Sequence, residues 1–375
     1  MRQNKGAPGI DGMRVDALAE HLRHHWLSIK ADVLAGRYRP QPVRRVEIPK
    51  PDGRKRMLGF RPQRNAHQAV RQVQGDVRDG HGWVVDLDLE SFFDRVNHDR
   101  LMHRLSRHVA DAALLRLIGA FVKAGAWVDG RREPSRMGVP QGGPLSPVMA
   151  NVVLDELDWE LHRRGHRFAR YADDCNIVVK SERAGQRVMR SVTRWIEDSL
   201  RLTVNTRKSA VDRPWNRTFL GFTLSCRDKS LKVADKAIDK LKERVRELSR
   251  RTRGHSLGQI VAELRTPLLG WKAYFGVTEV LSPLRELDKW IRRRLRCYAW
   301  KQWGSRGYRE LRKRGVSVRD AWNTSKSAHG PWRISKTPAL SLAMPVSFFS
   351  GMGLPQLAPA RAQAACIQRN EPPCT

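Results

Sequence analysis

A pair of adjacent aspartates constrains the fold of this chain more than any other feature. The segment RYADDCNIVV, residues 170–179, sets Asp173 and Asp174 between two runs of strand-forming residues. The two carboxylates repel each other and neither favours a strand, so the sequence predicts a hairpin with the acidic pair at its tip. By itself such a pair is a weak indication of function, since most of them lie in surface turns.

A second acidic strand is expected upstream, in GWVVDLDLESFFDRVNHDRLMHRL at residues 82–105. Asp86 and Asp88 alternate there with apolar residues, and a helix follows. Acids at the end of one strand and at a hairpin tip supply the carboxylate oxygens that Mg²⁺ prefers. With the Gly-rich PQGGPLSP loop between them, they predict a two-metal site, in which one metal activates a 3′-hydroxyl and the other stabilises a leaving pyrophosphate.

The charge balance indicates a nucleic-acid partner. The 375 residues contain 71 Lys and Arg against 38 Asp and Glu, a formal net charge of +33, and a chain this basic usually neutralises phosphates. The alternatives are a basic bias of the whole proteome or a membrane-surface protein, but no apolar run is long enough to span a bilayer. With no signal-peptide pattern and five cysteines without C-x-x-C spacing, we expect a cytoplasmic protein without disulfides or zinc fingers.

The remaining pattern predicts a mixed α and β chain. Helices are expected at residues 15–34, 65–78, 111–124 and 182–201, and strands or turns at 44–48, 56–60, 204–211 and 218–225. From residue 235 three amphipathic helices follow one another and predict a small bundle. Gly254 is expected to cap the first helix, Pro267 to kink the second and Pro283 to open the third.

A strongly basic segment overlaps the end of this bundle. Residues 285–314 contain twelve Lys and Arg against three acids, interleaved with five Trp or Tyr residues. A solvated helix face is the plain explanation, but a net charge of +9 favours a nucleic-acid surface. The residues expected to contact nucleic acid are Arg292, Arg293, Arg294, Arg296 and Lys301.

Several segments occur in an order and spacing that resemble one family. They are VDLDLESFFDRVNHDRL (85–101), GVPQGGPLSPVMANVVLDELD (138–158), YADD (171–174), VNTRKSAV (204–211) and FLGF (219–222), preceded by NKGAPGIDGM (4–13) and RYRPQPVRRVEIPKPDGRKR (37–56). The chain resembles the group II intron-encoded reverse transcriptase/maturases, of the bacterial type that lacks an endonuclease. The resemblance covers nearly the whole sequence.

The resemblance implies an α+β fold of the right-hand polymerase type. Its parts would be incomplete fingers at residues 1–80, a palm with the catalytic site at 81–225, a helical thumb or maturase X domain at 226–303, and a basic DNA-binding tail at 304–375 whose end is frayed. A zinc-supported nuclease is not expected, because only two cysteines and one histidine follow Trp303.

The resemblance also implies roles for single residues. Asp88, Asp173 and Asp174 would be the catalytic metal ligands, and the six-residue step from Asp88 to Asp94 selects Asp88 over Asp86. His98 and Cys175 lie close to these aspartates in the sequence, but we expect a packing role for both.

Five further residues are expected to bind the nucleotide: Lys50, Arg56, Phe93, Gln141 and Lys208. Lys50 and Arg56 would clamp the triphosphate, unless they belong to a generic basic hairpin. The Phe93 ring would exclude a 2′-hydroxyl. Gln141 would touch the incoming nucleotide or the template pair, and Lys208 would be a proton donor to pyrophosphate; for both, surface or loop packing is the alternative.

The sequence departs from the family in its fingers. In MLGFRPQRNAHQAV, residues 57–70, two family segments that are normally separated by a helical stretch run directly into each other. The family also places an extension before NKGAPGIDG, and only residues 1–3 precede that segment in this sequence. All the proposed metal ligands remain, so we hypothesise that polymerase activity is reduced or absent because the fingers are loosened.

The resemblance implies an RNA-directed DNA polymerase that binds its own intron RNA, assists splicing and copies RNA by target-primed synthesis. Its other partners would be target DNA, dNTPs and Mg²⁺. The alternative is a non-catalytic RNA-binding splicing factor or a decayed relic. A retron-type or diversity-generating reverse transcriptase is a third interpretation, which the long basic thumb and tail disfavour. The oligomeric state stays open.

Overall fold

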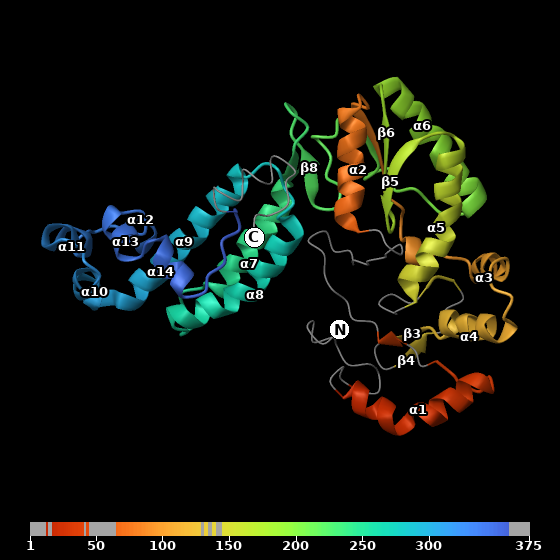
Figure 1. The fold of residues 1–375 in the computed structure, drawn as a ribbon, viewed down its shortest axis with the longest axis horizontal. Helices are drawn as coiled ribbons and strands as arrows, with labels where there is room; N and C mark the ends of the chain where they lie inside the picture. Colours follow the sequence, from red (N-terminus) through yellow and green to blue (C-terminus); the bar gives the residue numbers. More distant parts are fainter. Residues whose placement is uncertain are drawn as a thin grey trace, which may run out of the picture. The chain divides into compact units, whose positions relative to one another are not determined.

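The computed structural model describes residues 13, 17–40, 43–44, 65–128, 131–133, 137–139 and 145–359. The predicted strands at 44–48 and 56–60 fall largely or wholly outside these residues, as do the fused fingers segment and the end of the tail. The chain divides into two compact units, Met1–Phe219 and Leu220–Thr375. Figure 1 shows them in red to green and in green to blue.

A four-stranded antiparallel sheet forms the centre of the first unit. Its strands, in the order β5-β6-β2-β7, are Arg167–Tyr171, Asp174–Val179, Trp83–Leu87 and Ala210–Asp212. β5 and β6 pair from Tyr171–Asp174 down to Arg167–Val178, which confirms the predicted hairpin. Because the loop is only Ala172 and Asp173, the acidic pair lies at the tip of this hairpin.

Helices cover both faces of this sheet (Figure 1). α2 (Ala66–Arg78) lies against one face, and α5 (Ser146–Arg163) and α6 (Glu182–Trp195) lie against the other. Val85 and Ile177 point toward α5 and α6 and are fully buried in one core with the apolar faces of these helices. α6 can approach closely because Gly185 has no side chain: a Cβ there would lie 2.5 Å from Val211 Cγ1.

The remaining elements of the first unit are α1 (Leu18–Leu34), α3 (His98–Ser106), α4 (Ala112–Lys123), the 3₁₀ helix Phe92–Asp94, the π-helical segment Ile196–Leu200, and a small sheet of β1 (Val43–Arg44), β3 (Ala126–Val128) and β4 (Arg131–Glu133). The helices predicted at 15–34, 65–78, 111–124 and 182–201 are therefore all present, with ends that differ by a few residues.

The second unit begins with a short hairpin and the three predicted helices. They are β8 (Phe222–Leu224), β9 (Leu231–Val233), α7 (Asp235–Leu248), α8 (Leu257–Phe275) and α9 (Ser282–Trp303). The predicted cap at Gly254 is wrong. α7 ends at Leu248, whose carbonyl accepts a hydrogen bond from Arg253 Nη1 at 2.6 Å. A basic side chain, and not a glycine, therefore donates the hydrogen bond to the last carbonyl of this helix.

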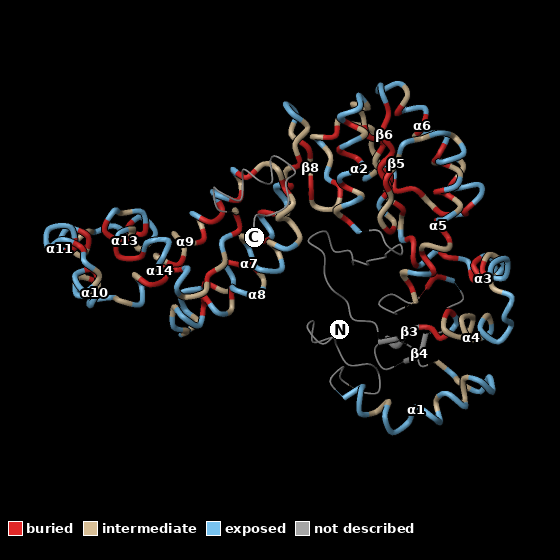
Figure 2. Tube along the Cα trace, in the orientation of Figure 1, coloured by how far each residue is buried: buried red, intermediate tan, exposed pale blue. Residues whose placement is uncertain are grey.

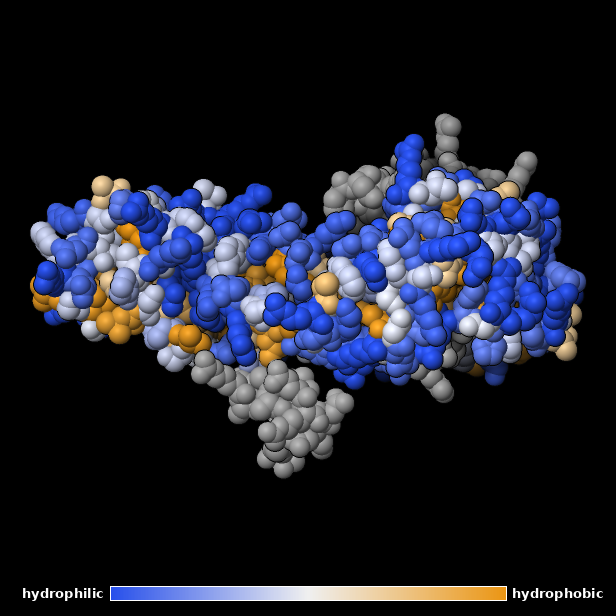
Figure 3. Space-filling view, turned by 90° about the horizontal axis from the view of Figure 1, so that it is seen from above, coloured by the Kyte–Doolittle hydropathy of each residue, from blue (hydrophilic) through white to orange (hydrophobic). Residues whose placement is uncertain are grey.

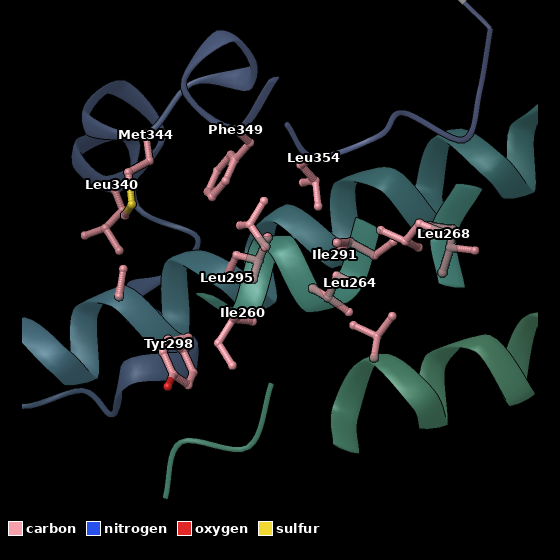
Figure 4. Packing of buried hydrophobic residues seen from close by; sticks show 14 of the residues in the cluster. Ile260, Leu264, Leu268, Ile291, Leu295, Tyr298, Leu340, Met344, Phe349 and Leu354 are labelled. Carbon is pink, nitrogen blue, oxygen red and sulfur yellow. The ribbon is translucent and has the colours of Figure 1, made fainter. Parts of the chain in front are cut away.

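The segment after α9 packs as part of the core. It folds into α10 (Gly307–Lys313), α11 (Val318–Ser325), α12 (Pro331–Ile334), α13 (Pro338–Ala343) and α14 (Val346–Gly351). Figure 2 shows buried backbone running through these helices, and Figure 4 shows Leu340, Met344 and Phe349 gathered against Leu295 of α9. Residues 304–359 thus complete the helical bundle, although the sequence indicated only a basic tail.

A buried carboxylate fastens the end of this segment. Asp288 of α9 accepts hydrogen bonds from the backbone N–H groups of Leu357 and Ala358, both at 3.0 Å. Burial raises the pKa of Asp288, and the two backbone hydrogen bonds oppose that rise. The carboxylate accepts the hydrogen bonds that these two buried amides can no longer donate to water.

Asp288→Ala is expected to lower the free energy of unfolding of the second unit by about 2–6 kcal/mol, since it leaves two buried amides unpaired at roughly 1–3 kcal/mol each. Chemical denaturation would measure this loss, and limited proteolysis should cut near residues 354–359 first. Glu286→Ala is the control, because Glu286 is exposed and pairs with Lys289 on the same helix. Equal effects of the two substitutions would contradict the role of Asp288.

Candidate active site

Asp88 directly follows β2, at the end of the central strand pair. β2 and β6 are in antiparallel register from Trp83–Val179 to Leu87–Cys175. One step further along this register sets Asp88 opposite Asp174. Residues opposite each other point to the same face of a sheet, and alternation puts this face on the side away from Val85 and Leu87. Asp88 and the hairpin tip therefore meet at one edge of the sheet.

The segment after α6 holds the backbone of Asp88 on both sides. The Asp88 N–H donates to Ser209 Oγ at 3.0 Å, and the Asp88 carbonyl accepts from the Asn205 N–H at 2.8 Å. A bridge between Leu89 and Val204 continues this pairing. This explains why the VNTRKSAV segment accompanies the acidic strand: it fixes the strand end from which Asp88 projects.

Two basic residues face the acids at the end of β2: Lys208 lies in the VNTRKSAV segment and Arg217 follows that segment. Lys208 Nζ lies 3.5 Å from Asp88 Oδ2, whereas Arg217 binds Asp86 through Nε at 3.0 Å and through Nη2 at 2.5 Å. Burial raises the pKa of Asp86, and the hydrogen bond from Arg217 opposes this rise. Asp86 Oδ2 thus accepts two short hydrogen bonds from Arg217, while the contact of Lys208 with Asp88 is longer, more exposed and therefore weaker. This geometry favours Asp88 over Asp86 as a ligand.

The turn of the hairpin is held in an uncommon conformation. Ala172 has a positive φ of 58°, in the left-handed region that costs energy for a residue with a Cβ. Its carbonyl accepts a hydrogen bond at 2.7 Å from Arg170 Nη1. Because that carbonyl belongs to the peptide that leads into Asp173, Arg170 helps fix the direction in which Asp173 leaves the turn.

Arg170 is itself fixed by α5. Its Nε and Nη2 donate to the two carboxylate oxygens of Asp158, each at 2.7 Å, and Nη1 also reaches Asn151 Oδ1 at 3.3 Å. The Arg170 and Asp158 side chains are only 2% and 8% exposed. A buried, two-point pair of this kind is rigid, and it ties the hairpin turn to the helix that follows the PQGGPLSP loop.

The three aspartates fit a hard cation by donor type. Carboxylate oxygens are the usual ligands of Mg²⁺. Asp173 is half-buried and Asp174 is exposed at the tip. Within the described ranges, however, no three acids, histidines or cysteines lie close enough together to hold an ion. The register brings the strand end and the hairpin tip side by side, but their carboxylates are not close enough together to form a complete set of metal ligands.

Phe93 is buried beneath this edge. It is only 4% exposed, packs edge-on against Phe92 at 5.0 Å, and its carbonyl accepts from the Val139 N–H at 2.7 Å. Gly138 precedes Val139 with a φ of +87°, and a Cβ there would lie 2.8 Å from the Phe93 carbonyl oxygen. Gly138 and Val139, which precede the PQGGPLSP loop, are therefore anchored on Phe93. Gln141, like Lys50 and Arg56, lies outside the described residues.

His98 and Cys175 have the packing roles that the sequence suggested. His98 is buried at the start of α3, where Nε2 lies 2.6 Å from the Gly138 carbonyl oxygen. Burial raises the pKa of Cys175 to about 12, so the thiol stays protonated and cannot act as a nucleophile.

Most of the arginines predicted to contact nucleic acid make contacts within the second unit. Arg293 donates to the Trp332 carbonyl and lies 3.8 Å above the Trp332 ring. Arg296 donates twice to the Met344 carbonyl, and Arg294 donates to Ser249 Oγ at 2.8 Å. These three side chains fasten the C-terminal helices and α7 to α9. Arg292 is half-buried and Lys301 is exposed. Binding of nucleic acid by all five stays a prediction.

Two family models match this chain in succession. Residues 38–224 match "Reverse transcriptase (RNA-dependent DNA polymerase)", and residues 238–315 match "Group II intron, maturase-specific domain". Protein YkfC of Escherichia coli (strain K12) is 30% identical over 279 residues, which cover 56% of this chain and 73% of that protein. The chain belongs to the group II intron reverse transcriptase and maturase family.

Membership in this family confirms the predicted α+β reverse transcriptase fold, the polymerase family and nucleic acid as the class of partner. The group II intron-encoded protein LtrA of Lactococcus lactis is 32% identical over 189 residues, which cover 41% of this chain but 31% of LtrA. A solved telomerase from Candida tropicalis, in complex with a fragment of telomeric RNA, aligns at a TM-score of 0.41 and 12% identity over 82% of this chain and 54% of its own. That likeness is too low to support an inference.

No helix in the described part of this maturase-family chain is long and apolar enough to cross a membrane. The match to the maturase-specific domain also separates the chain from the retron-type interpretation, although a retron reverse transcriptase of Escherichia coli is 25% identical over 142 residues.

Sequence reasoning missed the residues that support the aspartates. Arg170, Asp158, Ser209 and Arg217 act through contacts between segments up to 131 residues apart, and no local pattern reveals such contacts. The one available signal was the position of these residues relative to the family segments. Asp158 ends the segment 138–158, Ser209 lies in VNTRKSAV, and Arg170 directly precedes YADD.

Arg170→Met should lower the free energy of unfolding by about 3–5 kcal/mol, because it leaves the Asp158 carboxylate buried without its partner. Arg170→Met with Asp158→Leu should recover most of that loss, since it removes both charges. In both variants, backbone hydrogen exchange at residues 171–174 should rise.

Chemical denaturation and hydrogen-exchange mass spectrometry measure these two effects. Arg164→Met is the matched control, because Arg164 pairs with Glu160 on the same helix but is more exposed; about 1 kcal/mol or less is expected for it. If Arg170→Met lowers the free energy of unfolding no more than Arg164→Met does, Arg170 does not hold the hairpin turn in the way described.

Proposed function

We propose that this chain is an RNA-directed DNA polymerase and intron maturase that binds its intron RNA, assists splicing and copies RNA by target-primed synthesis. The observation that supports this best is the register of β2 and β6, which sets Asp88 beside the hairpin that carries Asp173 and Asp174. Both halves of the chain match models of the family that combines these two activities. The incoming substrates would be dNTPs, target DNA would be the second nucleic-acid partner, and the setting would be the bacterial cytoplasm.

The palm residues divide the work of this reaction. Asp88, Asp173 and Asp174 would hold Mg²⁺, which when bound would lower the pKa of the primer 3′-hydroxyl and stabilise the leaving pyrophosphate. Arg217 keeps Asp86 engaged, and Ser209 and Asn205 keep the Asp88 backbone in place. These contacts lie within the palm itself, so they would hold the strand end in place during the reaction.

Lys208 would act on the pyrophosphate that this reaction releases. Its ammonium group is paired with Asp88 and remains about two-fifths exposed. A cation at this position would neutralise charge at the carboxylate when no substrate is bound. It would then be available to a pyrophosphate oxygen or to a proton transfer during synthesis.

The domain assignment is part of this proposal. It consists of fingers at 1–80, a palm at 81–225, a thumb at 226–303 and a DNA-binding tail at 304–375. In the tail, the helices of residues 307–351 would present their outer surface to DNA while their inner side chains complete the thumb core.

The chief alternative is an RNA-binding splicing factor or a relic that has lost polymerisation. The fused fingers segment in the sequence is the specific observation that favours it. The two proposals differ in what the aspartates do, and one substitution therefore separates them.

Asp88→Asn is expected to reduce primer extension on poly(rA)/oligo(dT) with Mg²⁺ by at least about 100-fold, since loss of metal stabilisation removes several kcal/mol from the transition state. Binding of intron RNA, measured by filter retention, should stay within about twofold of the unsubstituted chain. Asp99→Asn is the control, because Asp99 is an exposed acid on nearby α3.

An unsubstituted chain that binds RNA but extends no primer, together with an unaffected Asp88→Asn variant, would establish the splicing-factor alternative. Full extension by Asp88→Asn would overturn the assignment of Asp88.

A further inference from the structure

α6 carries all its arginines on one face. Arg183, Arg187, Arg190 and Arg194 follow at steps of four, three and four residues, and each is exposed. At 3.6 residues per turn, the four positions fall within roughly 60° of one another around the helix axis. They form a straight line about 16 Å long, at a rise of about 1.5 Å per residue. We call these four residues the α6 arginine row.

The row lies opposite the buried face of α6. Gly185, Val188 and Val192 pack onto the sheet, and the row therefore points directly away from it. Asp88 and Asp174 lie on the other face of the same sheet by strand alternation. The sheet and the helix thus separate the row from the candidate catalytic edge. Figure 3 shows a largely hydrophilic surface over the described elements.

The row is costly for a helix that only faces water. Its members repel one another at three successive i,i+3 or i,i+4 steps, each of which destabilises a helix by about 0.2–0.5 kcal/mol. Glu182 is the one acid in α6, and no member of the row makes an ion pair with another residue that the structure describes.

α7 shows what an ordinary basic helix of this chain looks like. Its exposed residues mix both signs, and ion pairs join Lys242 to Asp239 and Arg244 to Glu247. The high arginine content of the chain therefore does not by itself produce an unbroken row. An anionic partner would turn the repulsion within α6 into attraction.

The form of the row indicates the backbone of a double helix. Proteins bind single strands through aromatic side chains on which bases stack, and the row contains none. Double-stranded RNA is recognised mainly by shape and by its phosphates, which a rigid line of guanidinium groups can follow and can bind at two points each.

We propose that the α6 arginine row binds the phosphates of a base-paired RNA segment, at a surface separate from the polymerase edge. The choice of RNA over DNA depends on the proposed function, in which the chain binds a folded intron RNA. The site would hold a helix of that RNA against the outer face of the palm while the opposite face of the sheet serves synthesis.

The test is the salt dependence of RNA binding by the full chain. The probe is a fully base-paired RNA hairpin, with a DNA hairpin of the same sequence and poly-L-glutamate alongside, and no nucleotides present. Replacing all four arginines by glutamine should reduce the slope of log K against log salt by about 3, at roughly 0.7–0.9 for each phosphate that is no longer neutralised. The thermal midpoint should not fall, because the substitutions relieve repulsion.

The quadruple lysine variant is the matched control and should keep most of the slope, because it keeps the charge. The paired variants Arg183→Gln with Arg187→Gln, and Arg190→Gln with Arg194→Gln, should each show about half of the effect.

A slope change below about 1 in the quadruple glutamine variant, little more than a single phosphate, overturns the proposal, and so does an equal change in the lysine variant. An equal change on the DNA hairpin means that the row binds the phosphates of either duplex, and a change confined to poly-L-glutamate assigns it to an acidic protein; each outcome overturns the choice of RNA. Since no primer is extended, failed polymerisation by the unsubstituted chain would count against the proposed function and leave this result interpretable.

Discussion

The antiparallel pairing of β2 with β6 is the constraint on which the candidate active site depends. Its register brings Asp88 from the first strand opposite Asp174 on the second, although the two are 86 residues apart. A slip of β2 by one residue would turn Asp88 toward the face covered by α5 and α6, beside Ile177, and would turn Val85 and Leu87 out of that core. The apolar residues of these strands therefore determine where the acids meet as strongly as the acids themselves do.

Charges around this pairing are held by partners that differ in burial. The Arg170–Asp158 pair is nearly dry and holds the hairpin turn, whereas the Lys208–Asp88 pair is open to water and can be exchanged. A buried pair with several hydrogen bonds resists change, and an exposed pair contributes little to stability. The palm thus combines a rigid support with carboxylates that stay accessible to a cation and to substrate.

The sequence was sufficient for the helices, the hairpin and the family, because each depends on local periodicity or on a contiguous motif. The strand and helix within residues 82–105 and the α7–α9 bundle are examples. It was insufficient for the end of α7, where a long-side-chain cap from Arg253 replaces the expected glycine. It also missed the folding of residues 307–351, because helices of four to eight residues are too short to show a periodic apolar face. Arg293, Arg294 and Arg296 suggested a nucleic-acid surface from charge alone, yet their hydrogen bonds run to Trp332, Ser249 and Met344.

Binding of Mn²⁺, a paramagnetic substitute for Mg²⁺, tests most directly whether the strand end and the hairpin tip form one site. Electron paramagnetic resonance would follow its titration into the unsubstituted chain, Asp88→Asn, Asp173→Asn and the double variant. If the two aspartates share their cations, each single substitution should cost nearly as much binding free energy as both together. Losses that simply add would mean that Asp88 and Asp173 act at independent sites, which would contradict a single centre built on the β2–β6 register.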